Sequence, residues 1–137
     1  AYQYESGSRV PIPDPEVLDI AKKEAHRLGV KQRSDISDEE ILVRVMFTLI
    51  NEGACILEEG IAAKSSDIDV IYAYGYGFPV YRGGPMQYAD EVGLSTILDK
   101  LVTYGDQLGD YGDMWLQPSD LLISLAKDGG TFKHYQK

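Results

Sequence analysis

Apolar residues recur at helical spacing in several stretches of the chain, and no stretch shows a convincing alternation of apolar and polar residues. The longest helical pattern covers residues 37–60, and Ser37 and Glu40 have the spacing of a capping box at its start. Its broad apolar stripe consists of Leu42, Val45, Met46, Leu49, Ile50, Gly53, Ile56, Leu57 and Ile61. We therefore predict that this segment is the central helix of an all-α domain.

Shorter patterns predict further helices on both sides of the central one. We expect them over residues 15–28, 67–74, 85–92, 96–102 and 118–128, the last one closed by Gly129 and Gly130. Ser66 and Asp69 indicate a second capping box, and Ser95 is placed to cap the helix after Gly93. The stretch 104–115 contains three glycines and is expected to be a loop. The whole pattern predicts a bundle of five to six helices.

Proline and glycine positions suggest how the chain is divided. Pro11, Pro13 and Pro15 alternate, so we expect residues 1–14 to be an extended entry linker. Residues 15–130 are expected to form the helical domain, with a polar connection over residues 30–36. Residues 131–137 are polar and are expected to be a flexible tail.

Residues 75–86 interrupt the helical pattern, and we call this segment the glycine elbow. It holds four glycines and two prolines, which exclude a regular helix, and it is too aromatic for a solvated linker. It is not a dinucleotide fingerprint, because a predicted helix precedes it, nor a phosphate loop, because Pro85 follows Gly84. We expect a structural loop between two helices, shaped by Gly75, Gly77, Pro79, Arg82, Gly83, Gly84 and Pro85.

The composition argues against several classes of binding partner. The net charge is −9 and the calculated isoelectric point is about 4.6. Such an acidic chain is unsuited to nucleic acid and to anionic membrane surfaces, and it disfavours unaided binding of a polyphosphate cofactor. No apolar run is long enough for a membrane span. The single cysteine excludes an intrachain disulfide and suits a reducing compartment.

The polar residues offer no catalytic set. Asn51 and Glu52 lie beside the apolar stripe, and we expect them to bind the amides of the glycine elbow, with ligand contact as the alternative. Arg82 could bind an anion or the carbonyls of a helix end. Neither histidine, His26 or His134, has an acidic partner at a telling spacing. We therefore expect no catalytic residue and no metal site; the chain packs, orients or pairs while another domain reacts.

Several segments resemble the C-terminal domain of 3-hydroxyacyl-CoA dehydrogenases. The resemblance covers nearly the whole chain and rests on residues 2–4, 51–54, 57–62, 67–69, 75–86, 92–94 and 117–121. The run Arg-Gly-Gly-Pro-Met over residues 82–86 is similar to the second, last copy of that domain in multifunctional fatty-acid oxidation enzymes, which join enoyl-CoA hydratase to the dehydrogenase. The fold this implies is the all-α class of 6-phosphogluconate dehydrogenase C-terminal domains.

The resemblance implies NAD-dependent oxidation of 3-hydroxyacyl-CoA in β-oxidation by the parent enzyme. The dinucleotide site and the acid/base pair would belong to a Rossmann domain that this chain lacks, so no cofactor is expected to bind here. Val43 stands where the first copy has a substrate-binding Asn, directly before Arg44. Because a Val side chain cannot donate a hydrogen bond, this copy is expected to be inactive alone.

The resemblance also implies pairing with the preceding dehydrogenase domains of the parent. The isolated chain is then expected to self-associate through its exposed pairing surface. Tyr74 matches a tyrosine that contacts substrate in bacterial members, so acyl-CoA is a candidate ligand; packing of the corner is the alternative role. We expect a bacterial cytoplasmic protein, or a peroxisomal one in a eukaryote. An independent acidic helical protein-interaction module is the alternative function.

Overall fold

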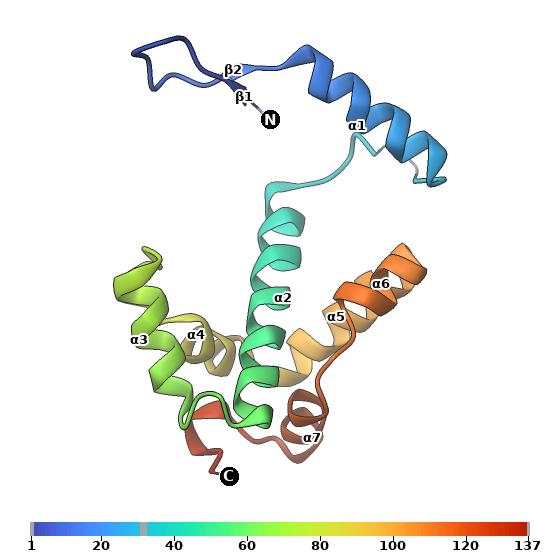
Figure 1. Ribbon diagram of the computed structural model, residues 1–137. Coiled ribbons are helices and arrows are strands. Elements are labelled where there is room, and N and C mark those ends of the chain that lie inside the picture. Colours follow the sequence, from blue (N-terminus) through green and yellow to red (C-terminus); the bar gives the residue numbers. More distant parts are fainter. Residues whose placement is uncertain (1, 31–32, 137) are drawn as a thin grey trace. The chain divides into compact units, whose positions relative to one another are not determined.

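A computed structural model describes residues 2–30 and 33–136 (Figure 1). It divides the chain into two compact units, Ala1–Ile36 and Ser37–Lys137. Residues 1, 31, 32 and 137, which belong to the predicted entry linker, connection and tail, lie outside the described residues. The division places the first helix with the entry segment, whereas the sequence pattern grouped it with the helical domain.

The first unit consists of two very short strands and one helix. Strands β1 (Tyr2–Gln3) and β2 (Ile12–Pro13) pair antiparallel, so part of the predicted extended linker closes into a hairpin. Helix α1 (Pro15–Arg27) follows, close to its predicted bounds. Asp14 caps it by accepting from the backbone N–H of Glu16 at 3.0 Å, as its place before Pro15 suggests. No residue of α1 is buried.

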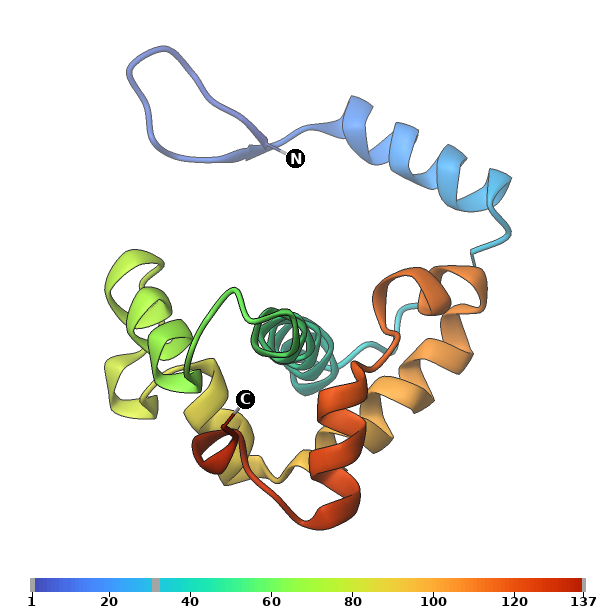
Figure 2. The ribbon, with the colours of Figure 1, turned by 60° about the horizontal axis from the view of Figure 1, so that its bottom comes forward.

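The second unit is a bundle of helices around α2, which confirms the predicted all-α fold. Its described residues form the following elements: α2 (Asp38–Glu59), α3 (Ser65–Gly75), η1 (Val80–Arg82), α4 (Pro85–Val92), α5 (Leu94–Leu108), α6 (Asp110–Trp115), α7 (Asp120–Asp128) and η2 (Phe132–His134). Figure 2 looks roughly along α2 and shows α3 and α4 on one side of it and α5 to α7 on the other. The long helix therefore supplies one face to each half of the bundle.

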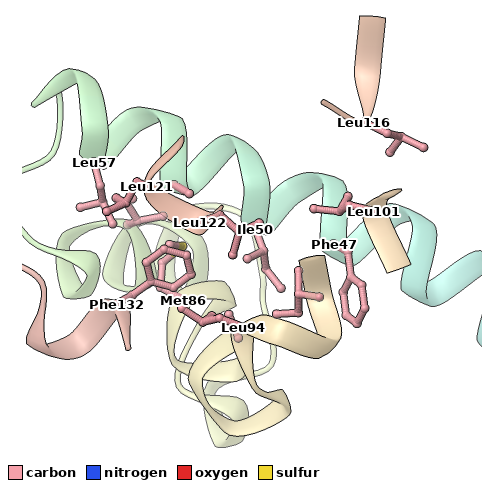
Figure 3. Close-up of a cluster of buried hydrophobic side chains, with 14 residues drawn as sticks. Phe47, Ile50, Leu57, Met86, Leu94, Leu101, Leu116, Leu121, Leu122 and Phe132 are labelled. Carbon is pink, nitrogen blue, oxygen red and sulfur yellow. The ribbon is translucent and has the colours of Figure 1, made fainter. Parts of the chain in front are cut away.

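The core is formed where α2 meets α4, α5 and α7 (Figure 3). The helix contributes Phe47, Ile50, Ala54 and Leu57. The other members of this hydrophobic core are Ile68, Met86, Ala89, Leu94, Ile97, Leu101, Leu116, Leu121, Leu122 and Phe132. Each large aliphatic or aromatic side chain fully removed from water contributes about 1.5–3 kcal/mol to folding.

The predicted stripe on α2 was too broad. Leu42, Val45 and Ile61 were assigned to it but are exposed, whereas Phe47 and Ala54 are buried and were not assigned. The reason is that periodicity defines a wide apolar arc, and the position of the neighbouring helices decides which part of it is covered.

A glycine in the middle of a helix, such as Gly53 in α2, often allows another backbone to approach closely. The neighbour is a side chain instead: a Cβ at this position would come within 2.5 Å of the Met86 sulfur. Met86 is the second residue of α4 and is fully buried. The missing side chain at Gly53 therefore makes room for the Met86 side chain against α2.

Two further predictions about helices were wrong, and the predicted tail needs a correction. The stretch 104–115 is not a loop, because α5 continues to Leu108 and α6 follows after Gly109. Ser95 is not a cap, since α5 begins directly after Gly93 without a side-chain cap. The predicted flexible tail contains η2, whose Phe132 is 1% exposed and belongs to the core. The apolar character of one residue in a polar segment therefore outweighed the composition of the segment.

Candidate functional site

The glycine elbow forms the irregular corner between α3 and α4 that the sequence predicted. Helix α3 includes Gly75 as its last residue, one position beyond the predicted end. The chain then folds back, because the N–H of Phe78 donates to the carbonyl of Tyr72 at 2.9 Å. The short turn η1 follows and leads to Gly84, directly before α4.

Asp69 on α3 closes this corner. Its Oδ1 accepts from the N–H of Met86 at 2.7 Å and its Oδ2 from the N–H of Gln87 at 3.2 Å, so it caps α4 from a neighbouring helix. Gly84 has no side chain to do so. The predicted capping box of Ser66 and Asp69 was therefore wrong: α3 is capped by Asp67, which accepts from the N–H of Lys64 at 3.1 Å.

The environment of Asp69 is partly apolar. Burial raises the pKa of Asp69, although the bonds from Met86 and Gln87 act in the opposite direction, and the charge of Asp90 adds to the increase. A carboxylate kept in such a place is a structural anchor, because its two bonds fix the start of α4 relative to the middle of α3.

Asp90, at the other end of α4, repeats the arrangement. Its two oxygens accept from the N–H groups of Phe132 at 2.8 Å and Lys133 at 3.0 Å. These bonds hold η2 and place the Phe132 ring in the core. No sequence signal indicated the roles of Asp69 and Asp90, because their partners lie far away along the chain.

Asn51 is buried, as its place beside the stripe suggested, but its partners are not in the glycine elbow. Its Nδ2 donates to the carbonyl of Gln117 at 2.8 Å, and its Oδ1 accepts from the N–H of Ser119 at 2.9 Å. Glu58, two turns later, accepts from the N–H of Leu121 at 3.4 Å. Helix α2 thus fixes the segment that enters α7. Glu52 is exposed and does not bind the amides of the glycine elbow, so the role predicted for it was wrong.

The outer side of the elbow is aromatic and exposed. Tyr74 is 81% exposed and Tyr81 is 84% exposed. The guanidinium of Arg82 lies over the ring of Tyr88 at 5.2 Å and near that of Tyr81 at 5.6 Å, as expected for cation–π contacts. Tyr74 therefore does not pack the corner, and its side chain is available to a partner.

Val43 lies beside a separate depression of about 250 Å³ between α2 and α5. Ser37, Glu39, Glu40, Val43, Lys100 and Tyr104 line it. The next residue, Arg44, is held by Glu40 at 2.9 Å and lies 4.0 Å from the centre of the Tyr104 ring. Its Nη2 donates to Gln107 at 2.8 Å. These contacts join the start of α2 to α5, while Val43 offers no polar group.

The described residues contain no group of three or more His, Cys, Asp or Glu that could hold a metal ion. His26 and His134 are both exposed, and His134 pairs with the hydroxyl of Thr131 at 2.8 Å. Burial, followed by the charges of nearby glutamates, raises the pKa of the Cys55 thiol, so it is a poor nucleophile.

Within the described part of the chain, no helix is long and apolar enough to cross a membrane.

Comparison with known proteins shows which family this sequence matches. Residues 41–133 match the family described as 3-hydroxyacyl-CoA dehydrogenase, C-terminal domain. Over 129 residues, 93% of this chain, the sequence is 44% identical to the peroxisomal bifunctional enzyme of Homo sapiens and 43% identical to that of Danio rerio. Identity to the peroxisomal fatty acid beta-oxidation multifunctional protein AIM1 of Arabidopsis thaliana is 34% over 131 residues. The chain spans 17–18% of the length of these relatives.

Proposed function

The chain belongs to the family of 3-hydroxyacyl-CoA dehydrogenase C-terminal domains, and we propose that it is a structural domain of a multifunctional β-oxidation enzyme. In this role it positions catalytic domains and performs no reaction by itself. The observation that supports the proposal most directly is the match over residues 41–133, which spans most of the bundle.

The polar chemistry of the chain is consistent with this role. The buried polar side chain Asn51 binds backbone groups of this chain, and the half-buried Asp69 and Asp90 do the same. Val43 occupies the position at which the resemblance implies a substrate-binding Asn. A domain whose polar groups are engaged in its own fold has little left for acid/base chemistry.

Nicotinamide chemistry would come from another domain of the parent. The elbow does not fit a dinucleotide, because helix α3 precedes Gly75 and Gly77, and a dinucleotide fingerprint follows a strand. The parent is proposed to oxidise 3-hydroxyacyl-CoA with NAD at a Rossmann domain. No step of that reaction is assigned to a residue of this chain.

Pairing is the proposed task of the helical bundle. The preceding dehydrogenase domains of the parent are the proposed partners, and in their absence the isolated chain is expected to self-associate through exposed apolar side chains. Tyr74, with its exposed ring, is the candidate for acyl-CoA contact. The peroxisome is the proposed compartment, because the names of three relatives, two from animals and one from a plant, contain the word peroxisomal.

An assay on the parent enzyme and on this chain tests the proposal. The parent is expected to form NADH from 3-hydroxyacyl-CoA, and the isolated 137-residue chain is expected to form none. In the parent, Asn51→Leu should lower the rate through loss of domain assembly, whereas the matched exposed variant Glu52→Gln should leave it unchanged. Turnover by the isolated chain would refute the structural role, and a parent without dehydrogenase activity would refute the proposed pathway.

A further inference from the structure

The segment after α7 crosses from one half of the bundle to the other. Gly129 ends α7 with a φ of +63°, and the N–H of Gly130 donates back to the carbonyl of Leu125 at 2.8 Å, which turns the chain away from the helix. Figure 2 shows the segment running from α7 to α4, where η2 packs against α4 and α3. We call residues 129–135 the strap. The strap thus links the α7 side of the bundle to the α3–α4 side.

A small number of groups hold the strap on α4. Asp90 accepts from the N–H groups of Phe132 at 2.8 Å and Lys133 at 3.0 Å. The Phe132 ring is 1% exposed and belongs to the same core cluster as Met86 (Figure 3). Tyr135 adds a partly buried ring, whereas Lys133 is exposed. A short segment held in this way opens at a lower free energy than a packed helix.

Helix α4 joins the strap to the glycine elbow. Met86 and Asp90 stand four residues apart and therefore share one side of α4. The N–H of Met86 donates to Asp69 at 2.7 Å, which fixes the start of α4 on α3, and its side chain fills the space over Gly53. The bonds to the strap and the bond that closes the elbow thus depend on the same side of one short helix.

We propose that the strap controls the mobility of the glycine elbow: while the strap is docked, α4 and the elbow are fixed, and when it opens, both become mobile. Helices α5 and α7 keep their own contacts with α2 and stay folded in both states. Because coupling between two positions is reciprocal, loosening the start of α4 also loosens the strap. A partner that draws the strap away would release the elbow without touching it. The inference does not rest on the proposed function.

Hydrogen exchange at a series of low urea concentrations tests this coupling in the 137-residue chain. The amides of Met86 and Gln87 at the start of α4 and those of Phe132 and Lys133 in the strap should open with one common free energy and one common urea dependence. Both values should be smaller than those of the buried residues of α5, because this opening exposes only part of the core. Different values for the two pairs of amides would mean that the strap and the elbow open separately, and would refute the proposal.

Two core truncations distinguish the coupling from general destabilisation. Phe132→Ala should lower the protection factors at Met86 and Gln87 by about tenfold or more, because the ring stabilises the docked state and not the open one. Leu101→Ala, at a buried position of α5, should leave these two protection factors unchanged, since α5 is packed in both states. An elbow that responds to Leu101→Ala as strongly as to Phe132→Ala would overturn the proposal, as would an elbow that responds to neither.

Asp69→Ala tests the coupling in the reverse direction. It removes the cap of α4, which lies outside the strap, and should lower the protection of the Phe132 and Lys133 amides by about fivefold, the factor that corresponds to a lost cap. Strap amides that keep their wild-type protection in this variant would show that the strap opens without the elbow, contrary to the proposal.

Two milder variants complete the test. Asp90→Asn weakens the hold on the strap but keeps the Phe132 ring, so it replaces Phe132→Ala if that variant does not fold. It should lower the protection of the strap and of the start of α4 together, and a loss confined to the strap would count against the coupling. Lys133→Ala is the control: its side chain is exposed and its backbone N–H remains, so neither region should change.

Discussion

Two stretches of the second unit are rich in glycine, and they fold in opposite ways. The glycine elbow, residues 75–86, is an irregular corner, as its composition suggested. The stretch 104–115 has three glycines and two tyrosines, and it is helical except at Gly109. Similar composition therefore led to a confirmed prediction in one place and a wrong one in the other.

The difference lies in what the glycines do. Gly84 in the elbow has a φ of +136°, a backbone conformation that other residues rarely adopt, and a Cβ there would overlap the Asp69 side chain. Gly112 lies in a helix, and a Cβ there would overlap the backbone of Gly105 on α5. Glycine thus permits an unusual turn in the elbow, whereas between α5 and α6 it permits two helices to approach closely.

The largest expected effect tests the close approach of α5 and α6. Gly112→Ala should lower the free energy of unfolding by about 3 kcal/mol, because rigid backbone would have to move. The matched control is Gly105→Ala on the facing helix, where the nearest foreign atom to a Cβ is 3.8 Å away, in ordinary contact. Urea unfolding of both variants measures the difference. Equal destabilisation by the two would show that helix approach is not the reason for Gly112.

A smaller effect is expected in the elbow. Gly84→Ala should cost about 2 kcal/mol, since the φ of +136° is strained for alanine and Asp69 must also move. The loss should appear as faster amide exchange at Met86 and Gln87, the first residues of α4 that Asp69 holds. Unchanged exchange at these two amides would contradict the coupling between the turn and its cap.

The variant Asp69→Ala tests the cap on α4 separately from the backbone turn at Gly84. It removes two hydrogen bonds to the start of α4 and should lower stability by about 1 kcal/mol, the usual cost of a lost cap. The pair α5 and α6 should keep its amide protection, because the bonds of Asp69 go to α4. Nuclear magnetic resonance exchange measurements on the two regions check this, and equal loss of protection in both would argue against a local role.

The smallest expected effect has the opposite sign. Gly75 ends α3, its φ lies outside the left-handed range, and a methyl group added there would meet no foreign atom within 4 Å. Gly75→Ala should therefore stabilise the chain by about 0.5 kcal/mol through helix propensity. Thermal unfolding measures the shift. A destabilised variant would mean that the elbow needs a glycine at its first position as well.

Local rules predicted much of the fold. Ser37 caps α2 by accepting from the N–H of Glu40 at 3.1 Å, and Asp14 caps α1, as their positions suggested. The all-α class and the corner at the elbow were also confirmed. These features depend on interactions within four residues of each other along the chain, which a sequence displays directly.

The wrong predictions share a different origin. Local spacing made Asp69 a cap for its own helix, and the amides of the glycine elbow were the partners predicted for Asn51. The structure pairs Asp69 with Met86 and Asn51 with Ser119, 17 and 68 residues away. Nothing in a single sequence specifies such a distant partner.

The sequence by itself determined the helical class, the starts of α1 and α2, and the corner of glycines and prolines, because short-range geometry and capping depend on neighbouring residues. Only the tertiary structure decided which part of the α2 stripe is buried, that α5 and α6 meet at Gly112, and which carboxylates hold α4 and η2. The physical reason is that burial and close approach depend on groups brought together by the fold, whose identity and distance the linear order does not contain.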